Sequence, residues 1–243
     1  FGSLWKNAFC LMLTYRKLGI QRRMDSATVL SIDTEPSRVR VTKSILSCPE
    51  YMAITRLYSR VRTKLEKLTL PAGLRSGMYL IPVALAAEVD TIIANAEEEL
   101  RQLVDVFLAQ YDTRIAEEAA RLKAAYRTSD YPDPDTVRAA FGLTYSYITF
   151  DLPGTLETIS TTMLKREERR SMEKVNNMLE DVNTYLREAM RSLVNHLADR
   201  LSPSDTGKSK TFKSSTLTNL LEFLNTFEAR NLGNDVELAQ LVS

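Results

Sequence analysis

Residues 83–126 carry the periodicity of a long amphipathic helix. Pro82 suits its first turn, and no glycine or proline interrupts it. Its apolar positions recur every three, four or seven residues, at Leu85, Val89, Ile92, Ala96, Leu100, Leu103, Phe107, Tyr111, Ile115, Leu122 and Tyr126. Residues 155–201 repeat this pattern, except between Leu164 and Val175, where almost every residue is polar. There we expect a solvent-facing stretch supported by charge pairs.

The two long helices are predicted to pack antiparallel across the connection 127–154, as a coiled-coil-like arm. This arrangement would bring Arg169 and Arg170 beside Glu117 and Glu118. Shorter periodic stretches predict four further helices, at 37–47, 49–68, 134–141 and 216–230. Two of them have clear start signals, because Pro49 opens one and Asp133 followed by Pro134 caps another.

Three short segments read as strands. Segment 8–15 is rich in strand formers with apolar residues on both faces, with a short helix as the alternative; 76–81 is closed by Pro82; and 143–150 alternates bulky and small polar residues. The predicted fold class is therefore mainly α, a long antiparallel helical hairpin with a small antiparallel β-sheet at its base. We expect one elongated domain with three regions: a basic N-terminal region at 1–75, the hairpin with short strands at 76–201, and a flexible loop with C-terminal helices at 202–243.

The composition is that of an ordinary soluble globular protein, with 44% hydrophobic and 26% charged residues among 243. No apolar stretch approaches the roughly 20 residues that span a bilayer, and no export signal is visible, so we expect no membrane association. Cys10 and Cys48 lie far apart in apolar or pre-proline contexts, which favours buried free thiols over a disulfide. A cytoplasmic location follows as the expectation.

Charge is divided unevenly along the chain. Residues 1–75 hold fourteen Lys and Arg against five Asp and Glu, whereas residues 76–160 hold six against fourteen. One face of the helix at 49–68 carries Arg56, Arg60, Lys64 and Lys67. This face either binds nucleic-acid phosphates or a partner, or it is a solvated face paired with the acidic long helix, which we favour. Arg75, beside the strand at 76–81, joins these candidate binding residues.

No combination of residues predicts catalysis or metal binding. His196 is the only histidine and is expected to be partly buried and structural, so a histidine triad or a two-histidine zinc site has no partner. Asp130, Asp133 and Asp135 suit turn and cap roles better than a cation site. The sequence at 205–209 imitates the end of a phosphate loop but lacks its first glycine and its strand context. We therefore predict no enzyme, no cofactor, and no catalytic, cofactor-binding or metal residues.

Three motifs together resemble a known family. They are Arg75-Ser-Gly-Met-Tyr-Leu-Ile-Pro82, Arg138-Ala-Ala-Phe-Gly142 and Leu221-Glu-Phe-Leu-Asn-Thr-Phe-Glu-Ala-Arg-Asn231. Their order and separation are similar to those of uncharacterised helical proteins from phages, plasmids and integrative elements, defined only as a domain of unknown function. Members of that family are often encoded beside a MoxR-type AAA+ ATPase and a von Willebrand factor A-like protein. The resemblance implies an adaptor role beside a remodelling ATPase and supplies no catalytic residues.

The sequence therefore predicts a non-catalytic helical adaptor or scaffold protein of a phage or mobile-element system. It would act through protein–protein contacts, with an AAA+ ATPase as the partner that the resemblance implies. Long amphipathic helices also favour a homo-oligomer. The alternative function is nucleic-acid binding through the basic N-terminal third.

Overall fold

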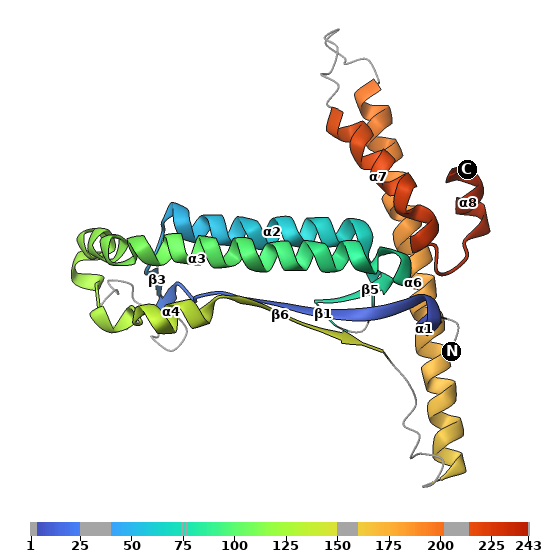
Figure 1. Cartoon of the computed structure of the whole chain (residues 1–243), viewed down its shortest axis with the longest axis horizontal. Coiled ribbons are helices and arrows are strands. Elements are labelled where there is room, and N and C mark those ends of the chain that lie inside the picture. Colours follow the sequence, from blue (N-terminus) through green and yellow to red (C-terminus); the bar gives the residue numbers. More distant parts are fainter. Residues whose placement is uncertain are drawn as a thin grey trace, which may run out of the picture. The chain divides into compact units, whose positions relative to one another are not determined.

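The computed structural model describes residues 4–24, 40–73, 75, 77–149, 160–201 and 214–242. Within these ranges the chain is mainly helical with a small antiparallel sheet, which confirms the predicted fold class (Figure 1). The helices are α1 (Leu4–Asn7), α2 (Pro49–Leu68), α3 (Ala86–Leu122), α4 (Pro134–Ala140), α6 (Thr161–Leu201), α7 (Ser214–Arg230) and α8 (Val236–Val242). The strands are β1 (Ala8–Arg16), β2 (Gln21–Arg23), β3 (Thr42–Ser44), β4 (Leu70–Pro71), β5 (Met78–Pro82) and β6 (Gly142–Ile148). Among the described residues, no helix combines the length and apolar character needed to cross a membrane.

The chain forms two compact units. The first contains Phe1–Leu13, Thr63–Thr91 and Tyr145–Ser243, and the second contains Thr14–Arg62 and Ile92–Thr144. Each unit therefore gathers segments that are distant in sequence. Each is described by itself below.

The four-stranded sheet has the order β4-β5-β1-β6, so the three predicted strands do share one sheet. β5 pairs antiparallel with β1, with Cys10 opposite Leu80, and β4 adds a short edge strand beside β5. A turn before β5 requires Gly77, whose φ is +80°. A Cβ atom at this position would lie 2.9 Å from the carbonyl oxygen of Leu13, so glycine alone fits without a shift of the backbone.

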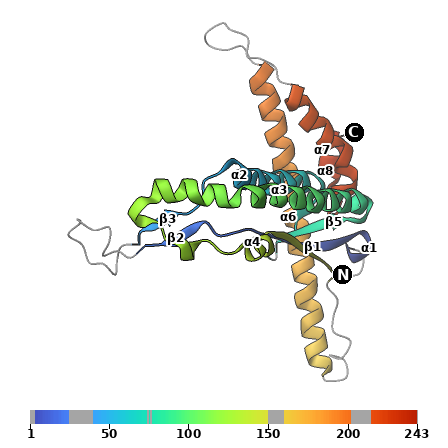
Figure 2. The same ribbon diagram turned by 60° about the vertical axis from the view of Figure 1, so that its left-hand side comes forward.

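The second unit is built around α2 and α3, which run side by side (Figures 1 and 2). Pro49 begins α2 as the sequence predicted, since its missing N–H costs nothing in the first turn. Phe107 of α3 lies 6.3 Å from Tyr51 of α2 and 5.7 Å from Phe141, between ring centroids. These edge contacts between aromatic rings fill the space between the two helices and the end of α4.

The buried side of α3 differs slightly from the predicted one. Val89, Ala96, Leu100, Phe107 and Tyr111 are buried as expected, but Ile93 and Val104 take the places predicted for Ile92 and Leu103. The buried residues are therefore spaced three or four positions apart, which keeps them on one face of this helix of 37 residues.

The first unit has its core where α6 and α7 meet the sheet. Both helices run side by side in two views (Figures 1 and 2). The buried members come from α1, β1, β4, β5, α6, α7 and α8, namely Leu4, Ala8, Cys10, Leu70, Leu80, Val175, Met178, Val182, Leu186, Phe223, Phe227 and Leu238. Before Val175, almost all of α6 from Thr161 is exposed or half-buried, as the lapse of the apolar pattern predicted.

The described contacts give each long helix a different partner from the one expected. α3 packs with α2 in the second unit, and α6 packs with α7 in the first. Glu117 and Glu118 accordingly pair with Arg114 and Arg121 of α3 itself, and Arg170 pairs with Glu167 one turn away. The reason is that α2 and α7 also carry apolar stripes, and periodicity does not specify which stripes meet.

One predicted helix is wrong where the structure describes it. Thr42–Ser44 of the segment 37–47 is strand β3, which pairs antiparallel with β2. The β-branched Val41 directly before the strand favours an extended backbone, and the segment pairs with Gln21–Arg23.

Candidate protein-binding site

The predicted basic face of α2 is partly neutralised. Arg60 donates to the Glu99 carboxylate of α3 at 2.5 Å. Lys67 lies 2.7 Å from a carboxylate oxygen of Glu222 on α7 and also donates to Asn219. Arg56 and Lys64 are exposed and join no ion pair within the described residues. Arg75 is exposed as well. Of the five candidates, Lys67 lines a concave site among the described residues.

The aspartates and the histidine also have clear placements. Asp133 caps α4 as predicted, and the hydrogen bonds that it accepts from the Thr136 hydroxyl at 2.7 Å and from the Thr136 amide at 2.9 Å lower its pKa. Asp130 pairs with the buried Lys43 at 2.6 Å. His196 is exposed on α6, so its predicted partial burial is wrong. The reason is that the buried residues of α6 end at Leu186, more than two turns before His196. The phosphate-loop imitation at 205–209 lies outside the described residues.

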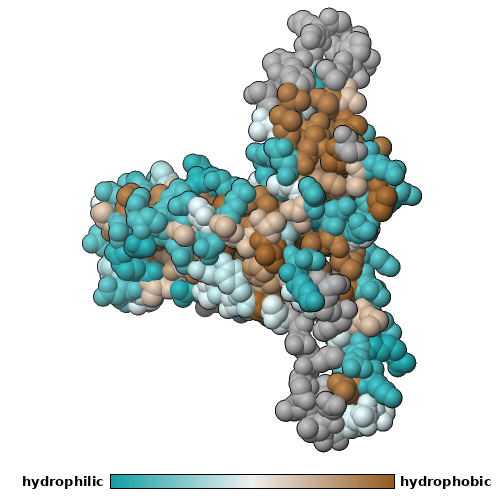
Figure 3. Space-filling model, turned by 45° about the vertical axis from the view of Figure 1, so that its right-hand side comes forward, coloured by the Kyte–Doolittle hydropathy of each residue, from teal (hydrophilic) through white to brown (hydrophobic). Residues whose placement is uncertain are grey.

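The helical pair α6–α7 leaves large apolar side chains exposed. Val194 of α6 is 44% exposed, and Leu217 and Leu221 of α7 are 45% and 51% exposed. Hydrophobic atoms gather over this pair in the space-filling view (Figure 3). The spacing of Leu217 and Leu221 places them on one side of α7, away from the buried Phe223 and Phe227. This apolar face of α6–α7 is larger than scattered single residues would make it.

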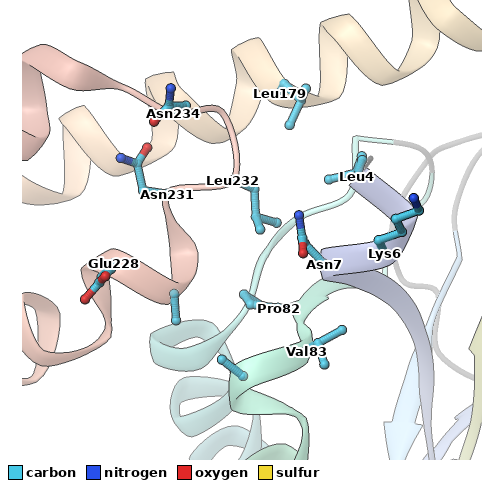
Figure 4. A pocket seen from close by; sticks show the side chains of 12 residues that line it. Leu4, Lys6, Asn7, Pro82, Val83, Leu179, Glu228, Asn231, Leu232 and Asn234 are labelled. Atoms are coloured by element: carbon cyan, nitrogen blue, oxygen red, sulfur yellow. The ribbon is translucent and has the colours of Figure 1, made fainter. Parts of the chain in front are cut away.

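The first unit contains a cleft of about 640 Å³ between α1, residues 82–84 just before α3, α6 and the turn after α7. Leu4 and Asn7 of α1, Pro82, and Leu232 surround it (Figure 4). Its polar group Asn231 is already committed, since this side chain bonds both the amide and the carbonyl of Asp235. Lys6, Glu228 and Asn234 also line the cleft, so its lining carries charges of both signs beside apolar side chains.

A second cavity, of about 300 Å³, lies between the C-terminal end of α2, α6 and α7. Tyr185, Ala189 and Leu193 of α6 and Phe223 of α7 form its apolar walls. Thr63, Ser192 and Asn219 add small polar groups, and Lys67, Glu66 and Glu222 add charges. Arg230, the last residue of α7, completes the lining, and we call this the Arg230 cavity.

Arg230 is only 2% exposed and lacks a carboxylate partner among the described residues. Its guanidinium carbon lies 5.4 Å from the ring centre of Phe223 and 5.8 Å from that of Tyr185. It donates to the Thr226 hydroxyl at a long 3.4 Å and also interacts with the Tyr185 hydroxyl, while its Nε–H has no acceptor among the described residues. Burial lowers the pKa of Arg230 below its ordinary value, and the neighbouring Tyr185 partly offsets this.

The surroundings of Arg230 are held in place by other bonds. The Tyr185 hydroxyl donates to the Glu66 carbonyl at 3.2 Å, which fixes the ring under the guanidinium. Lys67 engages Glu222 and Asn219, so this carboxylate is already neutralised by another cation. Among the described residues, this buried cation therefore has no counter-ion, although such groups are normally paired.

Sequence reasoning missed Arg230, Tyr185 and Phe223. Arg230 is a single basic residue at the end of a predicted amphipathic helix, where a cation commonly faces the carbonyl groups of the last turn. One signal was present, because the spacing of Phe223, Phe227 and Arg230 places all three on one side of α7.

The fold and the site define a mainly helical protein with an exposed apolar helical face and a cavity lined by a buried cation that has no carboxylate partner in the part of the chain that the structure describes. Within the described residues, no group of three or more His, Cys, Asp or Glu side chains is arranged to hold a metal ion. No protein-family model matches the chain, and neither a curated protein nor a solved structure is significantly similar to it.

Proposed function

We propose that this chain is a non-catalytic adaptor or scaffold that binds another protein through the α6–α7 pair. The observation that carries the proposal is the apolar face of α6–α7, where Val194, Leu217 and Leu221 are each more than two-fifths exposed. Exposed apolar surface of this kind is a cost to a free protein in water, and it is typical of surfaces that a partner covers.

The family resemblance supports a more specific partner. Its members are often encoded beside a MoxR-type AAA+ ATPase, and an adaptor would present substrates to such an enzyme. A phage or mobile-element system is the setting that the same resemblance implies. The buried free thiols of Cys10 and Cys48 fit the reducing conditions of the cytoplasm.

Nucleic-acid binding has less support. Arg60 and Lys67 of the basic face are each bonded to a carboxylate, which lowers the net positive charge available to phosphates. Both ion pairs are about half-exposed, so each adds little to the stability of the fold, but each cancels one positive charge of the basic face.

The test is capture of partners from the native host by the tagged full chain. Leu217→Asp together with Leu221→Asp should abolish capture, because both side chains are exposed and their replacement leaves the core intact. Val106→Asp is the matched control, since this apolar side chain is 55% exposed on α3. Identification of an AAA+ ATPase among the proteins lost would support the specific partner.

Two results would refute the proposal. One is that no protein is captured specifically. The other is that capture survives the double substitution as well as it survives Val106→Asp. Light scattering of the purified chain separates self-association from capture of another protein, because a homo-oligomer would lose mass in the double variant alone.

A further inference from the structure

The starting observation is the unused binding capacity of Arg230. A guanidinium has five N–H donors in a planar fork, and here they meet only the Thr226 hydroxyl, at a long 3.4 Å, and the Tyr185 hydroxyl among the described residues, with Nε–H left without an acceptor. The rings of Tyr185 and Phe223 fix the plane of that fork. The remaining donors belong to a side chain that lines an open cavity. This geometry is that of a preorganised anion receptor.

The charges around the cavity select the kind of anion. Arg230 and Lys67 contribute two positive charges, and Glu66 and Glu222 contribute two negative ones. A doubly charged phosphate would be repelled by the two carboxylates, whereas a carboxylate brings one negative charge to the one unpaired cation. Lys67 is occupied by Glu222, so it neither competes for the anion nor leaves Glu222 free to reach Arg230.

The walls select what carries the anion. Ala189, Leu193 and Phe223 offer apolar surface next to the guanidinium. A volume of about 300 Å³ suits one or two side chains rather than a large cofactor. The best complement is therefore an acidic residue adjacent to an apolar one.

We propose that the Arg230 cavity binds an aspartate or glutamate side chain of a protein partner, with an apolar neighbour of that residue against Leu193 and Phe223. Because the acidic side chain comes from another protein, this assignment rests on the proposed function. It adds a specific anchor at the last residue of α7 to the apolar contact that Leu217 and Leu221 offer on the same helix. The adaptor would then prefer segments in which acidic and apolar residues alternate.

A random library of displayed 12-residue peptides, selected on the intact full chain, tests the chemistry without knowledge of the partner. Selected peptides should be enriched in Asp or Glu next to Leu, Ile or Phe. Changing the acidic residue of a selected peptide to its amide should weaken binding about 10- to 100-fold, the range for a hydrogen bond to a charged group. Arg230→Met should cause a similar loss, and Arg230→Lys should restore only part of it, because a lysine lacks the planar fork.

The losses of affinity caused by the peptide amide and by Arg230→Met should not add, since each change removes the same contact. If the amide peptide loses as much affinity for Arg230→Met as for the unchanged protein, or if selection yields peptides without acidic residues, the proposal is wrong. A thermal unfolding curve for each variant confirms that it is folded.

Capture from the host separates this inference from the proposed function. If a partner is captured through Leu217 and Leu221 but binds Arg230→Met at full strength, the adaptor function stands and the acidic anchor is refuted. If acidic peptides bind in an Arg230-dependent manner but no protein is captured, the carboxylate site stands and the proposed function is refuted.

Discussion

Replacing Arg230 by methionine should stabilise the free protein. The guanidinium is 2% exposed, and removing one charge from water costs several kcal/mol in real proteins. Two cation–π contacts return about 1–2 kcal/mol each, and the long Thr226 bond returns about 0.5 kcal/mol or less. Methionine keeps an apolar stem of similar length and adds sulfur–aromatic contacts worth about 0.3–1.5 kcal/mol. We expect a net gain of about 1–2 kcal/mol.

For a chain of this size, that gain corresponds to an increase in Tm of roughly 2–8 °C. Differential scanning calorimetry and urea denaturation, followed for the transition of the first unit, measure it. Arg187→Met is the contrasting control, because Arg187 does have partners: it lies 2.5 Å from the buried carboxylate of Asp235 and 2.9 Å from Glu237. Its loss should lower Tm by leaving Asp235 buried without a counter-ion.

A clear decrease in Tm for Arg230→Met would refute the reasoning. It would show that stacking against Tyr185 and Phe223 outweighs the desolvation of the charge, so that Arg230 is a structural residue. An increase combined with a loss of peptide binding would instead identify a residue retained for binding at a cost in stability.

Three further predictions concern stability and reactivity. Arg187 holds the pKa of Asp235 below its ordinary value of 3.8, so the stabilisation is present above that value and is lost as pH falls through the lowered pKa. Between about pH 5 and pH 2, the Tm of the unchanged protein should therefore fall more steeply with falling pH than the Tm of Asp235→Asn, which retains a capping side chain. Equal slopes of Tm against pH in the two proteins would contradict this. Burial raises the pKa of the Cys10 thiol to about 11, so neither Cys10 nor Cys48 should react with a thiol reagent at pH 8 until the chain unfolds. Rapid labelling of the native protein would show that these positions open. Gly77→Ala should destabilise the sheet by about 1–3 kcal/mol in chemical denaturation, because of its positive φ and the close Leu13 carbonyl. Gly19→Ala should change little, because a Cβ atom there would make only an ordinary contact of 3.8 Å with the Arg22 side chain.

Local features of the fold followed from local sequence. Pro49 and Asp133 marked helix starts that the structure reproduces, because a fixed φ and a side-chain acceptor act within one turn. The polar stretch before Val175 is exposed, since solvation of a helix face depends on its own residues. Segment 37–47 was the exception, as β3 exists only through its bonds to β2, a strand about twenty residues earlier.

The periodicity of the chain by itself determined that α3 and α6 are long helices with one apolar side each, because both properties repeat every few residues along a single segment. Only the tertiary structure decided that α2 covers α3 and α7 covers α6, since several apolar stripes of similar width compete for the same partners. The Arg230 cavity depends on that choice. Tyr185 and Phe223 are 38 positions apart and meet around one guanidinium only when α7 folds back along α6. A single unpaired arginine becomes informative once its burial is known, and burial is a property of the assembled helices rather than of any one of them.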